Sequence, residues 1–284
     1  MQYVLSLFLM ATLYTTTLSQ THRFLYEVHY KKDSTQENIT KDHFVLDINP
    51  SSIVYYHRGL LVQDSLLKSN AVISSKTLPT SEEMFRFIQH DAGKRTFDSY
   101  ELLGMDMIKL SGETEQKWIL HNDKKKLQET QLQKATTSWK GRNWIAWFAF
   151  EIPFPEGPYK FHGLPGLITE IEDDRGNFSF KLIKSEKIDQ VQEIQAISFW
   201  MGHAIMIDWE KYIKIKKTFY QDPLSFLSNG KVNLTNEKEK MVLTDGTVVD
   251  KNNKRQVIKD QQQKIKKFNN PIELDQVINY PPGK

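Results

Sequence analysis

Apolar and polar residues alternate along several short stretches of this 284-residue chain. From Phe24 to Tyr30 every second residue is aromatic or valine, and the pattern recurs from Phe44 to Ile48. A period of two predicts β-strands with one buried and one exposed face. Other stretches with strand character are Ile53–Tyr56, Leu60–Gln63, Ser99–Leu110, Lys117–His121, Trp144–Glu151, Gly166–Ile171 and Phe178–Ile183.

The connections between these stretches are too short for helical crossovers, which favours an antiparallel meander. We therefore predict a β-rich α+β fold in which the meander forms a curved sheet or half-barrel. Helices are expected only in the C-terminal third of the chain. Asp208 is a predicted helix N-cap, Asp222-Pro223 a second one, and Asn253–Phe268 a weakly amphipathic helix.

The N-terminus has the features of an export signal. Val4–Tyr14 is apolar and uncharged, and Thr17-Leu18-Ser19 places small residues where a signal peptidase reads. We expect cleavage near Ser19-Gln20 and a periplasmic or secreted protein, since no later apolar stretch is long enough to span a membrane. The predicted organisation is a signal peptide at 1–19, an antiparallel β domain at 20–204 and a helical, loose segment at 205–284 that packs on the sheet or extends from it.

Composition excludes several kinds of chemistry. The chain has no cysteine, so disulfides, thiolate metal sites and cysteine nucleophiles are absent. Its net charge of +3 is far below the basic footprint of a nucleic-acid-binding protein. The histidines lack the spacing of a metal site, and Met201, His203 and Met206 are more typical of a core than of a copper site. We predict no cofactor and no metal.

The segment from Trp144 to Phe150 is apolar on both faces of its predicted strand. Such a strand needs cover on both sides. The cover is either the chain's own C-terminal helices or a ligand or partner. For the second case, the candidate contact residues are Trp144, Trp147, Phe148, Phe150 and His162.

Two turn signals follow this strand. Pro155-Glu156-Gly157-Pro158 predicts a tight reversal, and Leu164-Pro165-Gly166-Leu167 predicts a type II turn with Gly166 at positive φ. The glycines are therefore interpreted first as requirements of the backbone, and a contact role is the alternative.

The hexapeptide Gly163-Leu164-Pro165-Gly166-Leu167-Ile168 resembles the signature of the GLPGLI family of exported Bacteroidetes proteins. Flanking residues agree with that family: Phe44-Val45-Leu46, Lys134-Ala135, Gly141-Arg142, Ala146-Trp147, Glu151-Ile152-Pro153, Gly157-Pro158, Lys160-Phe161, Asp173 and Asn270-Pro271-Ile272-Glu273. Glu129–Leu132 departs from it, because members often have a cysteine there. The resemblance implies export and often a neighbouring TonB-dependent transporter, but it implies no catalytic residues. Likeness of the meander to the half-barrels of periplasmic lipoprotein carriers concerns the fold alone.

Three hypotheses follow. The first is a non-enzymatic binding or carrier module for an apolar ligand or an envelope protein such as a TonB-dependent transporter. The second is a hydrolase in which His162 acts with nearby acids such as Glu151 or Glu170. The third is an envelope scaffold that docks through Lys251–Phe268. Asp64-Ser65-Leu66 additionally resembles an acceptor triplet for O-linked glycans.

Overall fold

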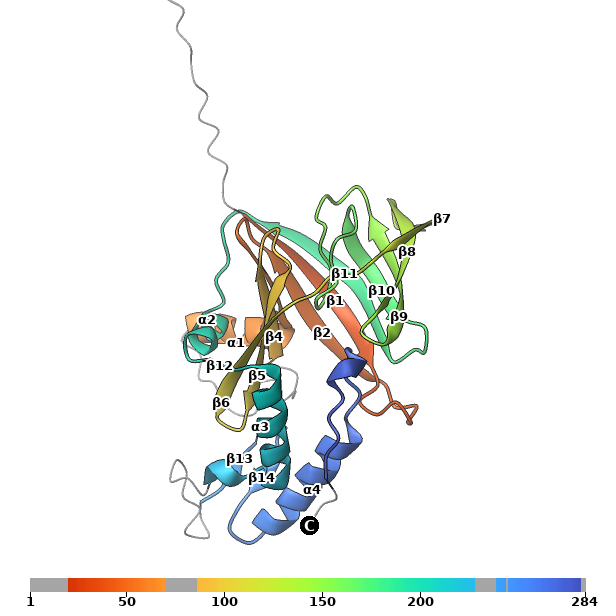
Figure 1. The fold of residues 1–284 in the computed structure, drawn as a ribbon. Coiled ribbons are helices and arrows are strands. Elements are labelled where there is room, and N and C mark those ends of the chain that lie inside the picture. The colour runs from red at the N-terminus through yellow and green to blue at the C-terminus, as the bar shows by residue number, and fades with distance from the viewer. Residues whose placement is uncertain (1–19, 70–85, 228–238, 244, 282–284) are drawn as a thin grey trace, which may run out of the picture.

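The computed structural model describes residues 20–69, 86–227, 239–243 and 245–281 (Figure 1). The predicted signal peptide at 1–19 lies outside these residues. A large, curved, twelve-stranded sheet dominates the described part of the chain. Its strands are β1 (Thr21–Tyr30), β2 (Thr40–Ile48), β3 (Ser52–His57), β4 (Arg86–Asp91), β5 (Thr96–Leu103), β6 (Asp106–Glu113), β7 (Ile119–Leu127), β8 (Thr130–Trp139), β9 (Arg142–Ala149), β10 (Leu167–Asp173), β11 (Phe178–Ile188) and β12 (Ile205–Met206).

The strand order is β12-β6-β5-β4-β3-β2-β1-β11-β10-β9-β8-β7. Two antiparallel meanders therefore meet where β1 pairs with β11 in the middle of the sheet. Only the short β12 runs parallel to its neighbour β6. The sheet is curved, antiparallel apart from β12, and not closed into a barrel. These features confirm the predicted antiparallel, curved sheet.

Each face of the sheet has its own core. The inner face, defined by Phe24, Tyr26, Val28 and Tyr30 of β1, belongs to the largest cluster of buried apolar residues. The outer face of β2–β6 carries Val45, Tyr56, Phe87, Tyr100 and Met107, which pack against α1 (Arg58–Lys68) and α2 (Gln195–Gly202). The alternation in the sequence thus separates the two cores.

The helix α1 corrects one prediction. Leu60–Gln63, expected as a strand, lies inside it. The imidazole Nδ1 of His57 accepts the backbone N–H of Gly59 at 2.9 Å and starts the helix directly after β3. Asp64 of α1 in turn accepts the N–H of Gln195 at 2.7 Å, so α1 caps α2. A run of four apolar or amide residues does not distinguish helix from strand.

The described residues of 207–227, 239–243 and 245–281 form what we call the C-terminal arm. It contains α3 (Trp209–Gln221), a short 3₁₀ turn η2 (Ser225–Leu227), the small β13–β14 ribbon (Met241–Val242 and Val248–Val249), α4 (Lys254–Lys267) and η3 (Leu274–Gln276). Asp208 caps α3 as predicted and accepts the N–H of Lys211 at 2.7 Å. After Asp222, whose side chain accepts the N–H of Leu224 at 3.2 Å, the described residues up to 227 form the short turn η2. No helix of the described residues is long and apolar enough to cross a membrane.

Candidate functional site

A cavity of about 700 Å³ lies between the inner face of the sheet and the C-terminal arm. This volume falls within the range of about 300–1,000 Å³ that is typical of small-molecule sites. Much of its wall is apolar or aromatic. The sheet contributes Val28, Tyr30, Phe44, Tyr55, Ile88 and Phe97, and the arm contributes Phe219, Phe226, Ile265, Phe268 and Ile278.

The alternating pattern of the strands builds the sheet side of this wall. Phe44 of β2 and Tyr55 of β3 are diagonal neighbours, since Phe44 pairs with His57 and Leu46 with Tyr55, and their rings stack at 5.2 Å between centroids. Val28 lies on the inner face of the adjacent β1. Because each of these residues occupies an inward position, the inner face presents a continuous apolar surface to the cavity.

Four polar side chains converge on the cavity wall at Glu101 of β5. Its carboxylate accepts from Arg86 of β4 and from Lys216 of α3, each at 2.8 Å, and from the hydroxyl of Tyr212. Tyr212 and Lys216 are four residues apart and share one face of α3. Burial opposes ionisation of Glu101, but the charges of Arg86 and Lys216 outweigh it, so the pKa of this carboxyl lies well below its usual range.

A second carboxylate on the wall, Glu273 of the arm, is only 3% exposed. It accepts from the hydroxyl of Tyr159 and the ammonium of Lys160, each at 2.7 Å, and lies 3.5 Å from the ammonium of Lys140. Burial, reinforced by the charge of Glu273, raises the pKa of the Tyr159 hydroxyl well above its usual value. Glu273 therefore connects the arm to the segment before the Gly163–Ile168 motif.

These two clusters influence each other electrostatically. The charge of Arg86 and the hydroxyl of Tyr212 both act on the pKa of Tyr159. Burial, with the charge of Glu101, raises the pKa of Tyr280 to about 12. We name the combined set the polar wall: Arg86, Glu101, Lys140, Tyr159, Lys160, Tyr212, Lys216, Glu273 and Tyr280.

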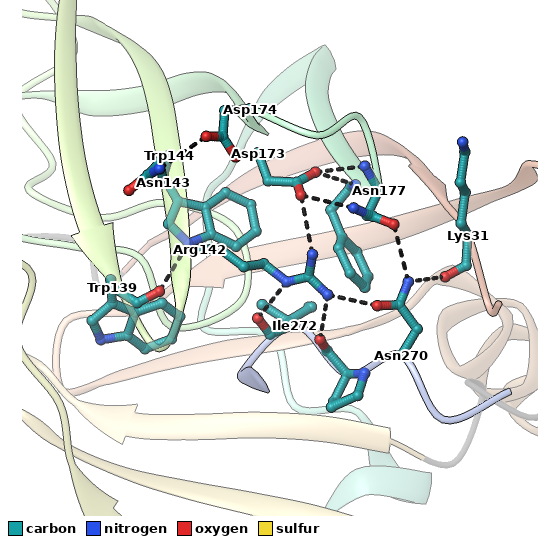
Figure 2. A network of polar contacts seen from close by, with 12 residues as sticks. Lys31, Trp139, Arg142, Asn143, Trp144, Asp173, Asp174, Asn177, Asn270 and Ile272 are labelled. Carbon is teal, nitrogen blue, oxygen red and sulfur yellow. Dashed lines mark hydrogen bonds and ion pairs between the residues drawn. The ribbon is translucent and has the colours of Figure 1, made fainter. Parts of the chain in front are cut away.

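A buried arginine fixes the far end of the arm. Figure 2 shows Arg142, which donates to Asp173 at 3.0 Å and to the backbone carbonyls of Pro271 and Ile272 and the side chain of Asn270 at 2.7–3.0 Å. Burial lowers the pKa of Arg142, while Asp173 opposes that effect. Arg142, Asp173 and the segment Asn270–Ile272 belong to the family resemblance and are far apart in sequence. The structure brings them together in one hydrogen-bond network.

The aromatic candidates of β9 do not line the cavity. Trp144 and Phe148 are fully buried in the inner core, where the ring of Trp144 lies 4.6 Å from that of Phe161. Trp147, on the outer face, is half-buried under the ammonium of Lys125 at 4.4 Å, and Phe150 is 69% exposed. The loop between β9 and β10 covers the inner face of β9.

The Gly163–Ile168 motif is part of that covering loop. Leu164, Leu167 and Ile168 are buried. The predicted positive φ at Gly166 is wrong, since Gly163 has φ +88° and Gly166 does not lie in the left-handed region. Gly166 is required for a different reason: a Cβ there would lie 2.2 Å from the carbonyl oxygen of Ala149.

His162 is part of the same loop, directly before Gly163, and does not line the cavity. Its Nδ1 is 3.0 Å from the carbonyl oxygen of Lys160, and its ring packs 5.1 Å from that of Phe97. Burial lowers its pKa. His90 lies 6.5 Å away between ring centroids, and its Nε2 is 3.1 Å from a carboxylate oxygen of Glu156. These contacts connect the loop to β4 and β5.

Other sequence-based candidates have structural roles. In the predicted docking segment Lys251–Phe268, Gln261, Ile265 and Phe268 line the cavity, and Val257 packs in the core of the arm.

Among the described residues, no group of three or more His, Asp or Glu side chains could hold a metal ion. Ser65 is exposed, whereas Asp64 is buried.

The chain matches a family model over residues 92–170, a stretch that runs from the end of β4 into β10 and includes the Gly163–Ile168 motif. The family is described as proteins of unknown function (Porph_ging). No curated protein matches the chain.

Among solved structures, the chain is similar to PNGF-II in space group C2, with a TM-score of 0.50 and 15% identity over 69% of this chain and 32% of that chain. PNGF-II in space group P21 gives a TM-score of 0.49 and 14% identity over 69% and 33%. The chain spans about a third of the length of PNGF-II. At this identity the similarity concerns the fold alone.

Proposed function

We propose that this protein is a binding module that encloses one predominantly apolar small molecule between the inner face of β1–β6 and the C-terminal arm. The cavity of about 700 Å³ carries this proposal. Its wall combines aromatic and aliphatic side chains with a few convergent polar groups, which is the usual composition of a ligand site. Both charged clusters on the wall pair their carboxylates with cations, so neither is arranged as a general base.

A cavity-filling substitution tests the proposal. Ser99 of β5 lines the cavity, and Ser99→Trp would place an indole inside it. Ser179 of β11 lies between the inward residues Phe178 and Phe180, so Ser179→Trp adds the same group on the outer face. With the neutral apolar dye Nile red, we expect the parent and Ser179→Trp to bind about one equivalent, and Ser99→Trp to bind at least tenfold more weakly. Equal binding by all three proteins would refute the proposal.

The hydrolase hypothesis has less support. It requires polar groups from distant segments to converge on His162 in a pocket, whereas His162 packs outside the cavity against Phe97. A carrier role in the cell envelope, with delivery to or from a TonB-dependent transporter, agrees with the predicted signal peptide. We propose this location, and determination of the N-terminus of the mature protein from fractionated cells tests it.

A further inference from the structure

The charges on the cavity wall narrow the class of ligand, on the premise that the cavity binds an apolar molecule. Six Lys or Arg side chains line the cavity against four Asp or Glu side chains. The excess is concentrated on the polar wall, where Glu101 is shared by two cations and Glu273 by two more. Asp275, which also pairs with Lys140, is about half exposed and does not line the cavity.

Two ammonium groups are placed to receive an anion. The side chains of Lys160 and Lys216 are only 13% and 15% exposed, so their charges are poorly screened by water. An ammonium has three N–H donors. Within the described part of the chain, each of these ammoniums donates one hydrogen bond to a carboxylate, at 2.7 Å for Lys160 and 2.8 Å for Lys216. A partly buried cation with donors to spare is stabilised by a further oxyanion.

The hydroxyls of Tyr159 and Tyr212 are not available as donors to such an anion. Tyr159 and Tyr212 donate to Glu273 and Glu101 and are held neutral beside those carboxylates. They fix the carboxylate oxygens and leave the lysines as the donors that face the cavity. Outside the polar wall, the cavity is lined by apolar residues such as Val28, Phe44 and Phe219.

We propose that the ligand is a single-chain amphiphile whose anionic oxygen-bearing head group contacts Lys160 and Lys216, with its apolar chain along the inner face of the sheet. Carboxylate and phosphate heads share this chemistry. The size of the cavity, which is within the range for small-molecule sites, favours one chain.

The test compares four molecules with the same twelve-carbon chain: laurate, dodecyl phosphate, dodecanol and dodecylammonium. Each is titrated calorimetrically below its micelle concentration. The second readout is the tryptophan fluorescence of the protein, in which Trp200 and Trp209 are the two of six tryptophans that line the cavity. We expect at least one of the two anions to bind about tenfold or more tightly than dodecanol, and dodecylammonium to bind most weakly. A preference for laurate indicates a carboxylate ligand, and a preference for dodecyl phosphate indicates a phosphate ester.

Variants separate this inference from the proposed function. Lys160→Gln and Lys216→Gln should each weaken binding of the preferred anion about tenfold and leave dodecanol binding unchanged, which also shows that the cavity is intact. Lys184→Gln removes an exposed ion pair with Glu186 and is the matched control, with unchanged binding of all four molecules. If dodecanol binds as tightly as both anions, or if the two cavity variants lose nothing, the head-group inference is wrong while the proposed function stands. If none of the four molecules binds, the proposed function fails as well.

Discussion

The two halves of the inner face differ in what covers them. Over β8–β10, the β9–β10 loop covers the surface, and its Phe161 and Leu164, each only 1% exposed, belong to the same buried cluster as Trp144. Over β1–β6, the C-terminal arm covers the sheet but leaves a cavity of about 700 Å³. The half with the dense aromatic sequence and the glycine motif is therefore the solid core, and the half with more dispersed signals has the space for a ligand.

The largest expected effect is in the filled half. Trp144→Ala removes a fully buried indole and should lower the free energy of unfolding by about 3–5 kcal/mol. Phe219→Ala removes a partly buried ring from the cavity wall and should lower it by only about 1 kcal/mol, while weakening Nile red binding. Urea unfolding measures both. Similar losses in the two variants would mean that the halves are packed alike.

Two glycines of the filled half sharpen the comparison at a smaller scale. Gly166→Ala forces a methyl group against the carbonyl of Ala149 and should lower the free energy of unfolding by about 3 kcal/mol. Gly163→Ala has open space around the added methyl, and only its φ of +88° opposes the change, at about 1–2 kcal/mol. Differential scanning calorimetry should show the larger drop in Tm for Gly166→Ala. The reverse order would mean that the left-handed backbone of Gly163, and not the close approach of Gly166 to Ala149, is the stricter requirement of the motif.

The smallest effect concerns pH. His162 has a pKa below its ordinary value of 6.5 because it is buried, so the unfolded chain binds a proton more readily than the folded one. The free energy of unfolding should therefore fall as pH drops from 7.5 to 5.5. His162→Gln should reduce this slope. If His162→Gln has the same pH dependence as the parent, the lowered pKa of His162 is not a source of the loss of stability at low pH.

Local patterns predicted the strands well where apolar and polar residues alternate, as in β1 and β2, and where a short run is apolar on both faces, as in β9. Ser99–Leu110 was expected as one strand but is the β5–β6 hairpin, because Gly104 at φ +65° reverses the chain. The polar β8 and the short β4 gave weak alternation and were not predicted. Of the polar wall, the family resemblance includes Lys160 and Glu273, and the pattern after Asp208 predicts a helix that carries Tyr212 and Lys216 but not their contact with Glu101. Glu101 and Lys216 come from segments 115 residues apart, and no local pattern shows that they pair.

The pairing of β1 with β11 also has a consequence for how the chain folds. Tyr30 pairs with Phe178, almost 150 residues later, so each meander can form from neighbouring strands but the two join only by closing a very long loop. Contacts of such high sequence separation slow folding. Until β11 is available, β1 presents an unpaired apolar edge that invites association with other chains. Any chain that ends before residue 178 keeps that edge permanently, and we expect it to aggregate.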